Sequence, residues 1–485
     1  MKKITLQIFA ILLSLSVHAQ DPAGKSLLID YEQYQIDGLL RYVDCGNNDI
    51  LNPGDSLTME AWVKVSQQSV NDNIKIFGKF GLDNTGYLFG KEASELYCEM
   101  WTPSQKEIKA GFMPPIAHWA HMVCTFAKGG SIKAYVNGIL VGEQNAGNNG
   151  IATSDNNLII GIAPWDLASF QYFGELDNIR IWNKELSADE VRYNMHHLLQ
   201  GDESGLVAYY EYENNLEDNS SYANHGTGAN LSELNFSNSK AVIANEILAP
   251  LADIHGVWLG LSSGSPLINQ ITNNGLTVST NIYADEHLLF GHNNLTGLST
   301  ENLPVNSPSN FKRQNRHWYI QSEGVSNANF NFSLSNGAAS GEMLNEDQDA
   351  SFYTLLYKEN ETQDYTAIKA GNIKIGDVIS FQGVVIDNGY YTLAVGDEAI
   401  PELLSVKESN TFSSIVYPNP SSGEFTLKHS EKVDLILMDL LGKVILKKEA
   451  SNTHNIKLDS HQKGVFLVKL ATTEGVQITK KIIIK

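Results

Sequence analysis

The sequence predicts an all-β, multidomain protein, and three observations lead to this class. The chain has 485 residues, which is too long for one ordinary domain, so we expect two to four domains. Its content of 42% hydrophobic and 18% charged residues is that of a folded protein. Its 39 glycines, 20 tyrosines and many Asn-Gly or Asn-Asn pairs indicate short strands joined by tight turns.

The first 19 residues have the pattern of a secretory signal peptide. Two lysines, at positions 2 and 3, precede the apolar stretch 4–17, and Ala19 supplies the small residue that a cleavage site needs. The apolar stretch is shorter than the roughly 20 residues of a membrane helix, and no later run approaches that length. We therefore expect cleavage after Ala19 and a mature chain without a transmembrane segment.

Charge excludes one class of partner and marks a domain boundary. The 34 basic and 55 acidic residues give a net charge of −21, which repels phosphate backbones and argues against nucleic-acid binding. Residues 411–485, in contrast, contain 11 Lys and 7 Asp plus Glu. Together with a break at Pro250, this asymmetry predicts three modules after the signal peptide (1–19), at 20–245, 250–398 and 411–485.

Alternation and turn chemistry define the strands of the first module. Every second residue from Leu57 to Val65 is apolar, which places one face of a strand in the core. Asn137-Gly138, between apolar stretches within 131–143, is the pair that a type I′ hairpin turn prefers. Residues 158–162 and 176–182 are predicted to form two further strands.

The first module also contains one predicted helix. Ser187 followed three residues later by Glu190 is a capping box, the signature of a helix N-terminus. We expect the helix to run to about Leu199 and to stop at Gly201. The histidine pair at 196–197, near the end of this helix, is interpreted as solvated.

Several segments of the first module carry a family resemblance. "LTMEAWVKV", "HWAHMVCTFAKGGSIKAYVNGILVGE" and "LIIGIAPWDLASFQYFGELDNIRIWNKELSADEVR" resemble a laminin-G-like jelly roll of the concanavalin A type. "GLVAYYEYENNLEDNSSYANHGTGAN" (205–230) resembles a segment that often accompanies such modules in bacterial surface proteins. The resemblance covers about 28–230 and implies a two-sheet sandwich of roughly 12 to 14 strands. It also implies a structural calcium ion.

Calcium prefers carboxylate, amide and carbonyl oxygens as ligands. The family pattern Gly-x-x-Asp-x-x-Arg-Ile-Trp matches 174–182 and keeps an aspartate at Asp177, which makes Asp177 the first candidate ligand. Asp30 and Asp44 flank the first strands and are the other two candidates. The alternative for Asp177 is that it orders a turn or pairs with Arg180.

The second module has strand patterns but no motif that indicates an activity. Phe330, Phe332 and Leu334 alternate with polar residues, and 352–357 and 378–385 are further predicted strands. "FKRQNRHWYI" and "DNGYYTLAV" resemble parts of a β-sandwich that recurs in secreted proteins of Bacteroidetes bacteria. The sequence therefore predicts a second β-sandwich-like module of unknown function.

The C-terminal module resembles a C-terminal sorting domain of the type IX secretion system. Its motifs are "YPNP" at 417–420, "GK" at 442–443, "KGVF" at 463–466 and the terminal "KKI". The resemblance implies an immunoglobulin-like β-sandwich that engages the type IX secretion machinery. It also implies delivery to the outer cell surface or release from the cell.

Hydrolysis of sugars is the first activity to consider for the jelly roll. Retaining glycosidases need two carboxyl groups about 5–5.5 Å apart, one as nucleophile and one as acid. Laminarinase-type enzymes of this fold share a Glu-x-Asp-x-x-Glu strand motif, and the nearest segment here starts at Glu175 and Asp177. The position of the acid holds Arg180, which cannot donate that proton near neutral pH. The sequence therefore predicts no catalytic residues.

Sugar binding usually relies on exposed aromatic rings beside polar groups. The candidates in turn-rich stretches are Trp101, Trp165, Tyr172 and Phe173, for which core packing is the alternative.

The three cysteines of the exported chain allow one disulfide, for which Cys98 and Cys124 are the predicted pair. The alternative is that all three are buried as free thiols.

These observations favour a secreted or cell-surface binding and adhesion protein that is not an enzyme. Its expected ligand is a polysaccharide or surface glycan, bound at an edge of the jelly roll with calcium ordering nearby loops. One alternative is a polysaccharide-degrading hydrolase with its catalytic residues in the second module or at Glu175 and Asp177. The other is a structural adhesin that binds surface proteins.

Overall fold

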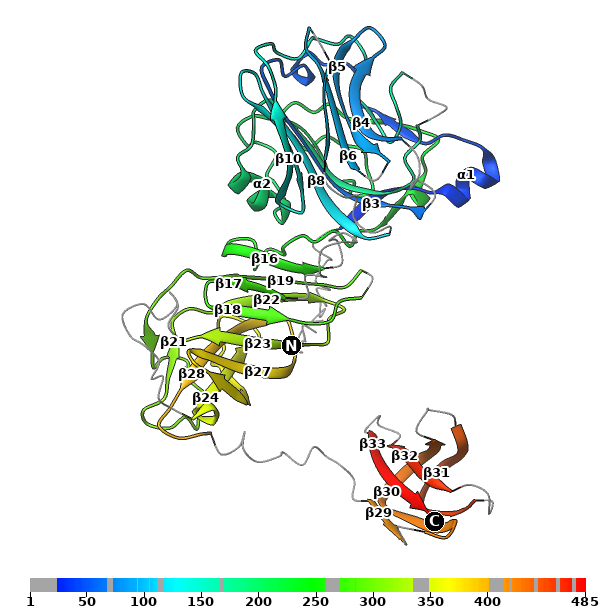
Figure 1. Cartoon of the computed structure of the whole chain (residues 1–485), viewed down its shortest axis with the longest axis vertical. Coiled ribbons are helices and arrows are strands. Elements are labelled where there is room, and N and C mark those ends of the chain that lie inside the picture. The colour runs from blue at the N-terminus through cyan, green and yellow to red at the C-terminus, as the bar shows by residue number, and fades with distance from the viewer. Residues whose placement is uncertain are drawn as a thin grey trace, which may run out of the picture. The chain divides into compact units, whose positions relative to one another are not determined.

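In the computed structural model, β-strands form most of the regular structure of the described residues (Figure 1). The predicted signal peptide lies outside the residues that it describes. Two short α-helices, α1 (Tyr31–Asp37) and α2 (Ala188–Met195), accompany the strands. The structure describes residues 24–67, 73–93, 95–103, 105–110, 117–165, 170–258, 270–283, 285–334, 349–400, 414–417, 421–439, 444–458, 463–472 and 477–485.

The chain divides into two compact units, residues 1–400 and 401–485. The first unit contains two successive β-sandwiches, one in the region predicted as the laminin-G-like module and one in the second module. The second unit contains the strands of the predicted sorting domain. No helix in the described part of the chain is long and apolar enough to cross a membrane.

The first sandwich has an eight-stranded sheet, called sheet A here, and a seven-stranded sheet, called sheet B. The fifteen strands exceed the expected number because the structure includes very short ones such as β11. Sheet A runs in the order β10 (Ile139–Asn145), β9 (Ser131–Val136), β8 (Trp119–Ala127), β3 (Ser56–Val65), β12 (Gly174–Trp182), β1 (Lys25–Ile29) and β15 (Phe236–Asn238), with β13 (Leu206–Tyr210) also on β12. Sheet B runs in the order β14 (Thr227–Ala229), β2 (Tyr42–Asp44), β11 (Ile159–Ile160), β4 (Ile74–Gly81), β5 (Thr85–Glu92), β6 (Glu95–Trp101) and β7 (Gln105–Ala110).

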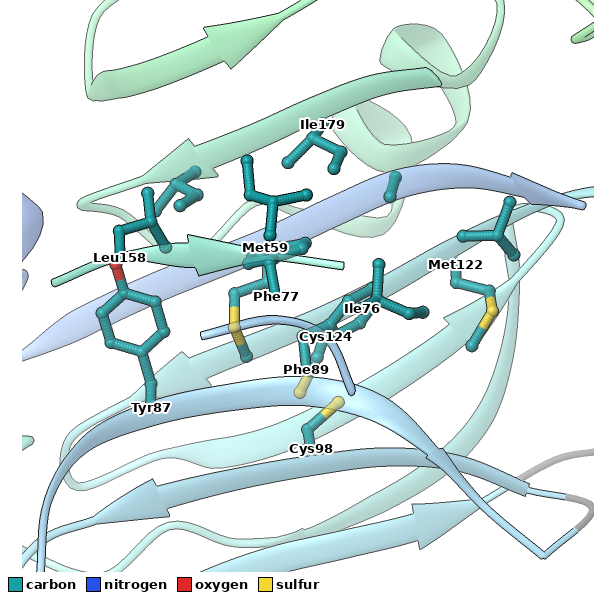
Figure 2. Packing of buried hydrophobic residues seen from close by; sticks show 14 of the residues in the cluster. Met59, Ile76, Phe77, Tyr87, Phe89, Cys98, Met122, Cys124, Leu158 and Ile179 are labelled. Carbon is teal, nitrogen blue, oxygen red and sulfur yellow. The ribbon is translucent and has the colours of Figure 1, made fainter. Parts of the chain in front are cut away.

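The core of the first sandwich lies between sheets A and B (Figure 2). The alternation predicted for β3 is confirmed, since Leu57, Met59, Ala61, Val63 and Val65 all belong to the buried cluster. They face apolar residues of sheet B, among them Ile76, Phe89 and Cys98. Burial of this two-sided apolar surface is what closes the sandwich.

The hairpin and the helix start form as predicted, whereas the helix ends early. Asn137 and Gly138 have φ values of 51° and 73°, the left-handed pair of a type I′ turn between β9 and β10. Ser187 caps α2, and Glu190 completes the capping box. The helix stops at Met195 rather than near Leu199.

The second module is a β-sandwich, as predicted, built around Phe330, Phe332 and Leu334. One sheet runs β16 (Ala252–Trp258), β19 (His287–His292), β22 (Trp318–Glu323), β28 (Gly389–Val395), β21 (Lys312–Gln314) and β20 (Leu298–Ser299), with β24 (Tyr353–Lys358) on β28 and β25 (Thr366–Ala370) on β24. The facing sheet runs β17 (Gln270–Asn273), β18 (Leu276–Ser279), β23 (Asn327–Ser333), β27 (Val378–Val385) and β26 (Ile373–Ile375).

The two sandwiches pack against each other within the first unit. Trp62 of β3 meets Trp258 of β16 edge to face, with ring centroids 6.0 Å apart. The backbone N–H of Asn245 donates to Gln321 Oε1 at 2.7 Å, and Gln321 Nε2 donates to the carbonyl of Ile243 at 2.9 Å. The outer face of sheet A is therefore covered here by the second sandwich and the chain that leads into it.

The second unit forms one five-stranded sheet network around its own apolar core. Its strands are β29 (Ser414–Tyr417), β30 (Glu424–Asp439), β31 (Val444–Lys457), β32 (Gly464–Thr472) and β33 (Gln477–Ile484). The β-rich fold expected for the sorting domain is confirmed. Of its predicted motifs, 418–420 and 440–443 lie outside the described residues.

Candidate ligand-binding sites

Arg180 is a buried structural anchor. Its guanidinium donates to the carbonyls of Asn194 and His197 and to Asn178 Oδ1, at 2.9, 2.5 and 3.0 Å. Its Nη1 also lies 3.6 Å from Glu60 Oε1. Burial works to raise the pKa of Glu60, but the contacts of Glu60 with His121 and Arg180 outweigh burial and lower it. Glu60 is therefore ionised and holds Arg180 beneath the end of α2.

Glu175 and Asp177 do not form an open catalytic pair. Asp177 is fully buried, and its two oxygens accept hydrogen bonds from Asn178 Nδ2 at 2.8 Å and Ser239 Oγ at 2.5 Å. Burial raises the pKa of Asp177 well above its usual value. Glu175 accepts from Ser26 and lies 3.3 Å from Lys64 Nζ. Both carboxyl groups are engaged within the fold, so the structure gives no support to hydrolysis at these residues.

The three predicted calcium ligands have separate roles. Asp30 caps α1 by accepting the Glu32 N–H at 2.9 Å. Asp44 accepts from the Gly46 N–H and from Asn157 Nδ2, each at 2.9 Å. It lines a hollow of about 580 Å³ in which it is the one carboxylate among the described lining residues. Within the described part of the chain, no three His, Cys, Asp or Glu side chains gather as a metal site would require.

The four aromatic residues predicted as sugar-binding platforms lie in different environments. Tyr172 is fully buried, and its hydroxyl donates to the carbonyl of Glu175 at 2.8 Å, so its prediction as an accessible platform is wrong. Phe173 is half-buried and packs edge-on against Tyr31 of α1, with centroids 5.1 Å apart. Trp165 is half-buried and packs on Phe80 at 5.0 Å. The prediction for Tyr172 is wrong because the turn-rich stretch that contains it folds back into the core.

Trp101 lines a hollow at the end of β6. The hollow has a volume of about 400 Å³ and is bordered by Asn84, Thr102, Pro103, Asn149, Gly150 and Ala152. Asn84 and Asn149 are exposed, and Asn84 occupies the left-handed turn between β4 and β5, with φ of 63°. The hollow, called the Trp101 hollow here, thus places an indole beside two side-chain amides at an edge of the jelly roll.

A larger pocket lies at the junction of the two sandwiches. It has a volume of about 660 Å³ and lies between the β9–β10 turn, α2 and β16. Its apolar lining includes Ile139, Met195, Leu251, Ile254 and Ile271. It is called the junction pocket here, and its size falls in the range of small-molecule and side-chain binding sites.

Two of the histidines that line the junction pocket are those predicted from the sequence to be solvated. His196 and His197 are 1% and 6% exposed, so the prediction that they are solvated is wrong. His196 Nδ1 lies 2.7 Å from the Val242 carbonyl, and His197 stacks on Tyr193 with centroids 3.8 Å apart. The helix period places this pair at a helix end but carries no information about the second sandwich that covers it.

The segment 205–230 has a structural role in the described fold. The Asp218 carboxylate accepts hydrogen bonds from the N–H groups of Tyr209, Ser220 and Asn224 at 2.7 to 2.8 Å. Ser220 Oγ and Asn224 Nδ2 also donate to Asp218. A buried carboxylate satisfied in this way fixes a turn and leaves little capacity for a ligand.

Comparison with known families identifies two parts of the chain. Residues 38–192 match the concanavalin A-like lectin/glucanases superfamily, and residues 415–485 match the secretion system C-terminal sorting domain. The chain is 31% identical to human adhesion G-protein coupled receptor D1 over 104 residues. That match spans 21% of this chain and 11% of the receptor.

Solved structures of low similarity were also found. A proposed carbohydrate-binding protein from Bacteroides ovatus aligns over 46% of this chain and 61% of its own, at 17% identity and a TM-score of 0.35. A heptameric pentraxin from Limulus polyphemus aligns over 35% of this chain and 80% of its own, at 16% identity and a TM-score of 0.27. The two family matches show that the chain carries a laminin-G-like domain of the concanavalin A-like superfamily and a sorting domain for type IX secretion to the cell surface or the extracellular space.

Proposed function

We propose that this protein binds glycans outside the cell through the Trp101 hollow of its laminin-G-like sandwich. The observation that carries the proposal is the pairing of the Trp101 ring with the Asn84 and Asn149 amides around about 400 Å³. An aromatic face packs on the apolar face of a sugar ring, and amides exchange hydrogen bonds with its hydroxyls. The superfamily whose description names lectins and glucanases supports the same ligand class.

Binding is favoured over hydrolysis by the carboxylates of β12. Glu175 and Asp177 are held by Ser26, Lys64, Asn178 and Ser239, so neither is placed to act on a sugar. A glycosidase would also need a second free carboxyl group at a fixed separation from the first. The described border of the Trp101 hollow contains no carboxylate.

The proposal is tested by passing the exported chain over a panel of polysaccharides, once with calcium and once with a chelator. Retention of the protein and release of reducing ends are measured in the same experiment. We expect retention without release of reducing ends, and a loss of at least about tenfold in affinity for Trp101→Ala and Asn149→Ala. Tyr222→Ala is the matched control, because Tyr222 is 46% exposed and lines none of the three cavities described above. Released reducing ends, or equal retention of the Trp101 variant, would overturn the proposal. Comparison of retention with calcium and with chelator tests the predicted calcium ion.

A further inference from the structure

The hollow that Asp44 lines contains the same kinds of group as the Trp101 hollow, and it is called the Asp44 hollow here. Its volume is about 580 Å³, and its lining includes the Tyr42 ring together with His225 and Thr227. His225 and Thr227 are exposed, so their polar side chains are accessible to a ligand. A ring beside imidazole and hydroxyl groups suits the apolar face and the hydroxyls of a sugar.

The hydrogen bonds of the Asp44 hollow leave both donors and acceptors for a ligand. The Asp218 N–H donates to His225 Nδ1 at 3.2 Å, so the imidazole is neutral and its Nε2–H is a donor. The exposed amide of Asn48 also lines the hollow and supplies a second donor. Asp44 Oδ2 accepts from Asn157 Nδ2 at 3.0 Å and has capacity for one further hydroxyl. The hollow can therefore exchange hydrogen bonds with a polyhydroxylated ligand in both directions.

Both hollows lie at the same end of sheet B. Strands β2, β4 and β6 run in the same direction, and β2 ends at Asp44 whereas β6 ends at Trp101. Asp44 is in register with Gly78 of β4 through β11, and Gly78 is in register with Glu99 of β6 through β5. Strands β2 and β6 are four positions apart in the sheet, which corresponds to about 19 Å at about 4.8 Å per strand. A ligand that contacts both hollows is therefore an extended chain.

A polar segment connects the two hollows along this end of the sheet. Ala152 lines the Trp101 hollow, and Asn157 Nδ2 donates to the Asp44 carboxylate at 2.9 and 3.0 Å. The exposed residues between Ala152 and Asn157 are a threonine and an aspartate. This segment therefore offers polar groups to the hydroxyls of a chain that crosses from one hollow to the other.

The charge of the two hollows favours a neutral chain. Asp44 is the one carboxylate among the described residues that line either hollow, and those residues include no lysine or arginine. The carboxylates of a polyuronate or the sulfates of a sulfated glycan would lie near Asp44 without a cation to compensate them. A glycan without charged groups avoids this repulsion.

We propose that the Asp44 hollow is a second subsite for the glycan, and that the ligand is a neutral oligosaccharide or polysaccharide chain that spans both hollows. This inference rests on the proposed function, in which the Trp101 hollow is the first subsite. Once one end of a chain is bound, contact of the same chain with the other hollow is intramolecular. Affinity therefore increases with chain length until the chain reaches both hollows.

A ladder of neutral oligosaccharides tests the two subsites. Laminari-, cello-, xylo- and manno-oligosaccharides, from disaccharides to hexasaccharides, are titrated by calorimetry into the full exported chain. We expect at least one series to bind, with an affinity at least about tenfold higher for the hexasaccharide than for the disaccharide. The carboxymethylated polysaccharide of the same backbone should be retained less than its neutral parent. Absence of binding in all four series, equal affinity at all lengths, or preference for the carboxymethylated form would overturn the inference.

Variants separate the second subsite from the first. His225→Ala should lower the affinity for the hexasaccharide by at least about fivefold and leave that for the disaccharide unchanged. Thr227→Val removes a hydroxyl at nearly constant shape and should act in the same direction, which covers the case in which His225→Ala disturbs its turn. Trp101→Ala should weaken binding at both lengths. Tyr283→Ala is the control, because Tyr283 is 65% exposed and lines none of the three cavities.

The two proposals fail in different ways. Loss of hexasaccharide binding in Trp101→Ala, without any loss in the His225 and Thr227 variants, would overturn the second subsite and leave the proposed function standing. Loss in the His225 and Thr227 variants, with none in Trp101→Ala, would overturn the proposed site at the Trp101 hollow.

Discussion

Arg180 holds the chain that follows α2 against the outer face of sheet A. Its contacts with Asn194 and His197 use backbone carbonyls at the end of the helix and just beyond it. The indole N–H of Trp62 likewise donates a hydrogen bond to the Met195 carbonyl at 2.8 Å. These side-chain donors take the place of further helical turns, which explains why α2 ends four residues before the position predicted from its sequence.

Replacement of Arg180 by methionine should strongly destabilise the first unit. The change removes the guanidinium and leaves Glu60 buried without its charged partner, a situation that typically costs about 3–5 kcal/mol. Urea unfolding of the variant measures this loss. Glu60→Gln added to Arg180→Met should restore part of the stability, whereas Arg192→Ala, on the exposed side of α2, should have little effect. An unchanged midpoint for Arg180→Met would contradict the anchor role.

His196 predicts a pH dependence of stability. Its folded pKa of about 3 lies below its usual value of 6.5 because the ring is buried. As the pH falls below 6.5, the unfolded chain binds a proton that the folded chain does not, so stability is lost at about 1.4 kcal/mol per pH unit. The free energy of unfolding, measured from pH 7 to pH 4, should fall less steeply for His196→Gln than for the parent. Parallel curves for the two proteins would contradict this assignment.

At the scale of elements, the start of α2 depends on local capping. Ser187 Oγ accepts the Glu190 N–H at 3.2 Å, and Glu190 Oε2 accepts the Ser187 N–H at 2.7 Å. Ser187→Ala removes one side of this capping box and should lower the free energy of unfolding by about 1 kcal/mol. Ser204→Ala, at an exposed turn position, is the matched control and should change the denaturation midpoint little. An equal effect of both variants would argue against the cap.

Strands β6 and β8 bring Cys98 and Cys124 together across the core. The two residues belong to opposite sheets, and Figure 2 shows their sulfur atoms pointing toward one another. Both thiols are free in this structure, and burial together with the Cys124 contact raises the pKa of Cys98 well above its usual value. The predicted disulfide would link sheet A to sheet B at this point.

Oxidation by an envelope thiol–disulfide oxidoreductase should join this pair during export, since disulfides form and persist in oxidising compartments. We expect the exported protein to have a mass lower by about 2 Da than the reduced chain, the two hydrogens lost on S–S formation. Reductant should lower its stability by about 3 kcal/mol, and Cys98→Ala should remove that response. Cys45→Ala is the control, because Cys45 is buried elsewhere. Three alkylatable thiols in the unfolded exported protein would contradict the pairing.

At the scale of the whole molecule, the chain has two units with opposite charge. Residues 411–485 carry more Lys than Asp plus Glu, whereas the complete chain has a net charge of −21. Each unit has its own apolar core, so neither needs the other in order to bury its strands. This independence suits a sorting domain that is needed for export and not for the fold of the exported part.

Removal of residues 401–485 should leave the first unit folded. Calorimetry of the complete chain should show separate transitions for the two units, and the transition of residues 20–400 alone should match one of them. Its retention on glycans should also be unchanged if the Trp101 hollow is the binding site. A fall of more than a few degrees in the transition of the first unit would show that its stability depends on the second.

Sequence patterns alone predicted the features that neighbouring residues decide. The alternation of β3, the Asn137-Gly138 turn and the Ser187 cap each depend on a few consecutive residues, and all three form as expected. The two family segments are likewise contiguous in the chain, so their motifs identified the laminin-G-like and sorting domains. Trp101, predicted from its turn-rich surroundings as a sugar-binding ring, lies beside a hollow at the end of β6, and its role in binding stays a prediction.

Tertiary packing alone decided which side chains remain accessible. Tyr172 is buried because its loop folds back into the core, and His196 is buried because a second sandwich packs over the outer face of sheet A. The three aspartates predicted as calcium ligands do not gather into one site, since Asp30 caps α1, Asp44 contacts Asn157 and Asp177 contacts Ser239. The junction pocket likewise requires α2 and β16 to meet, and no local pattern encodes that contact. Burial is a property of the assembled surfaces, whereas turns, caps and alternation are properties of the local chain.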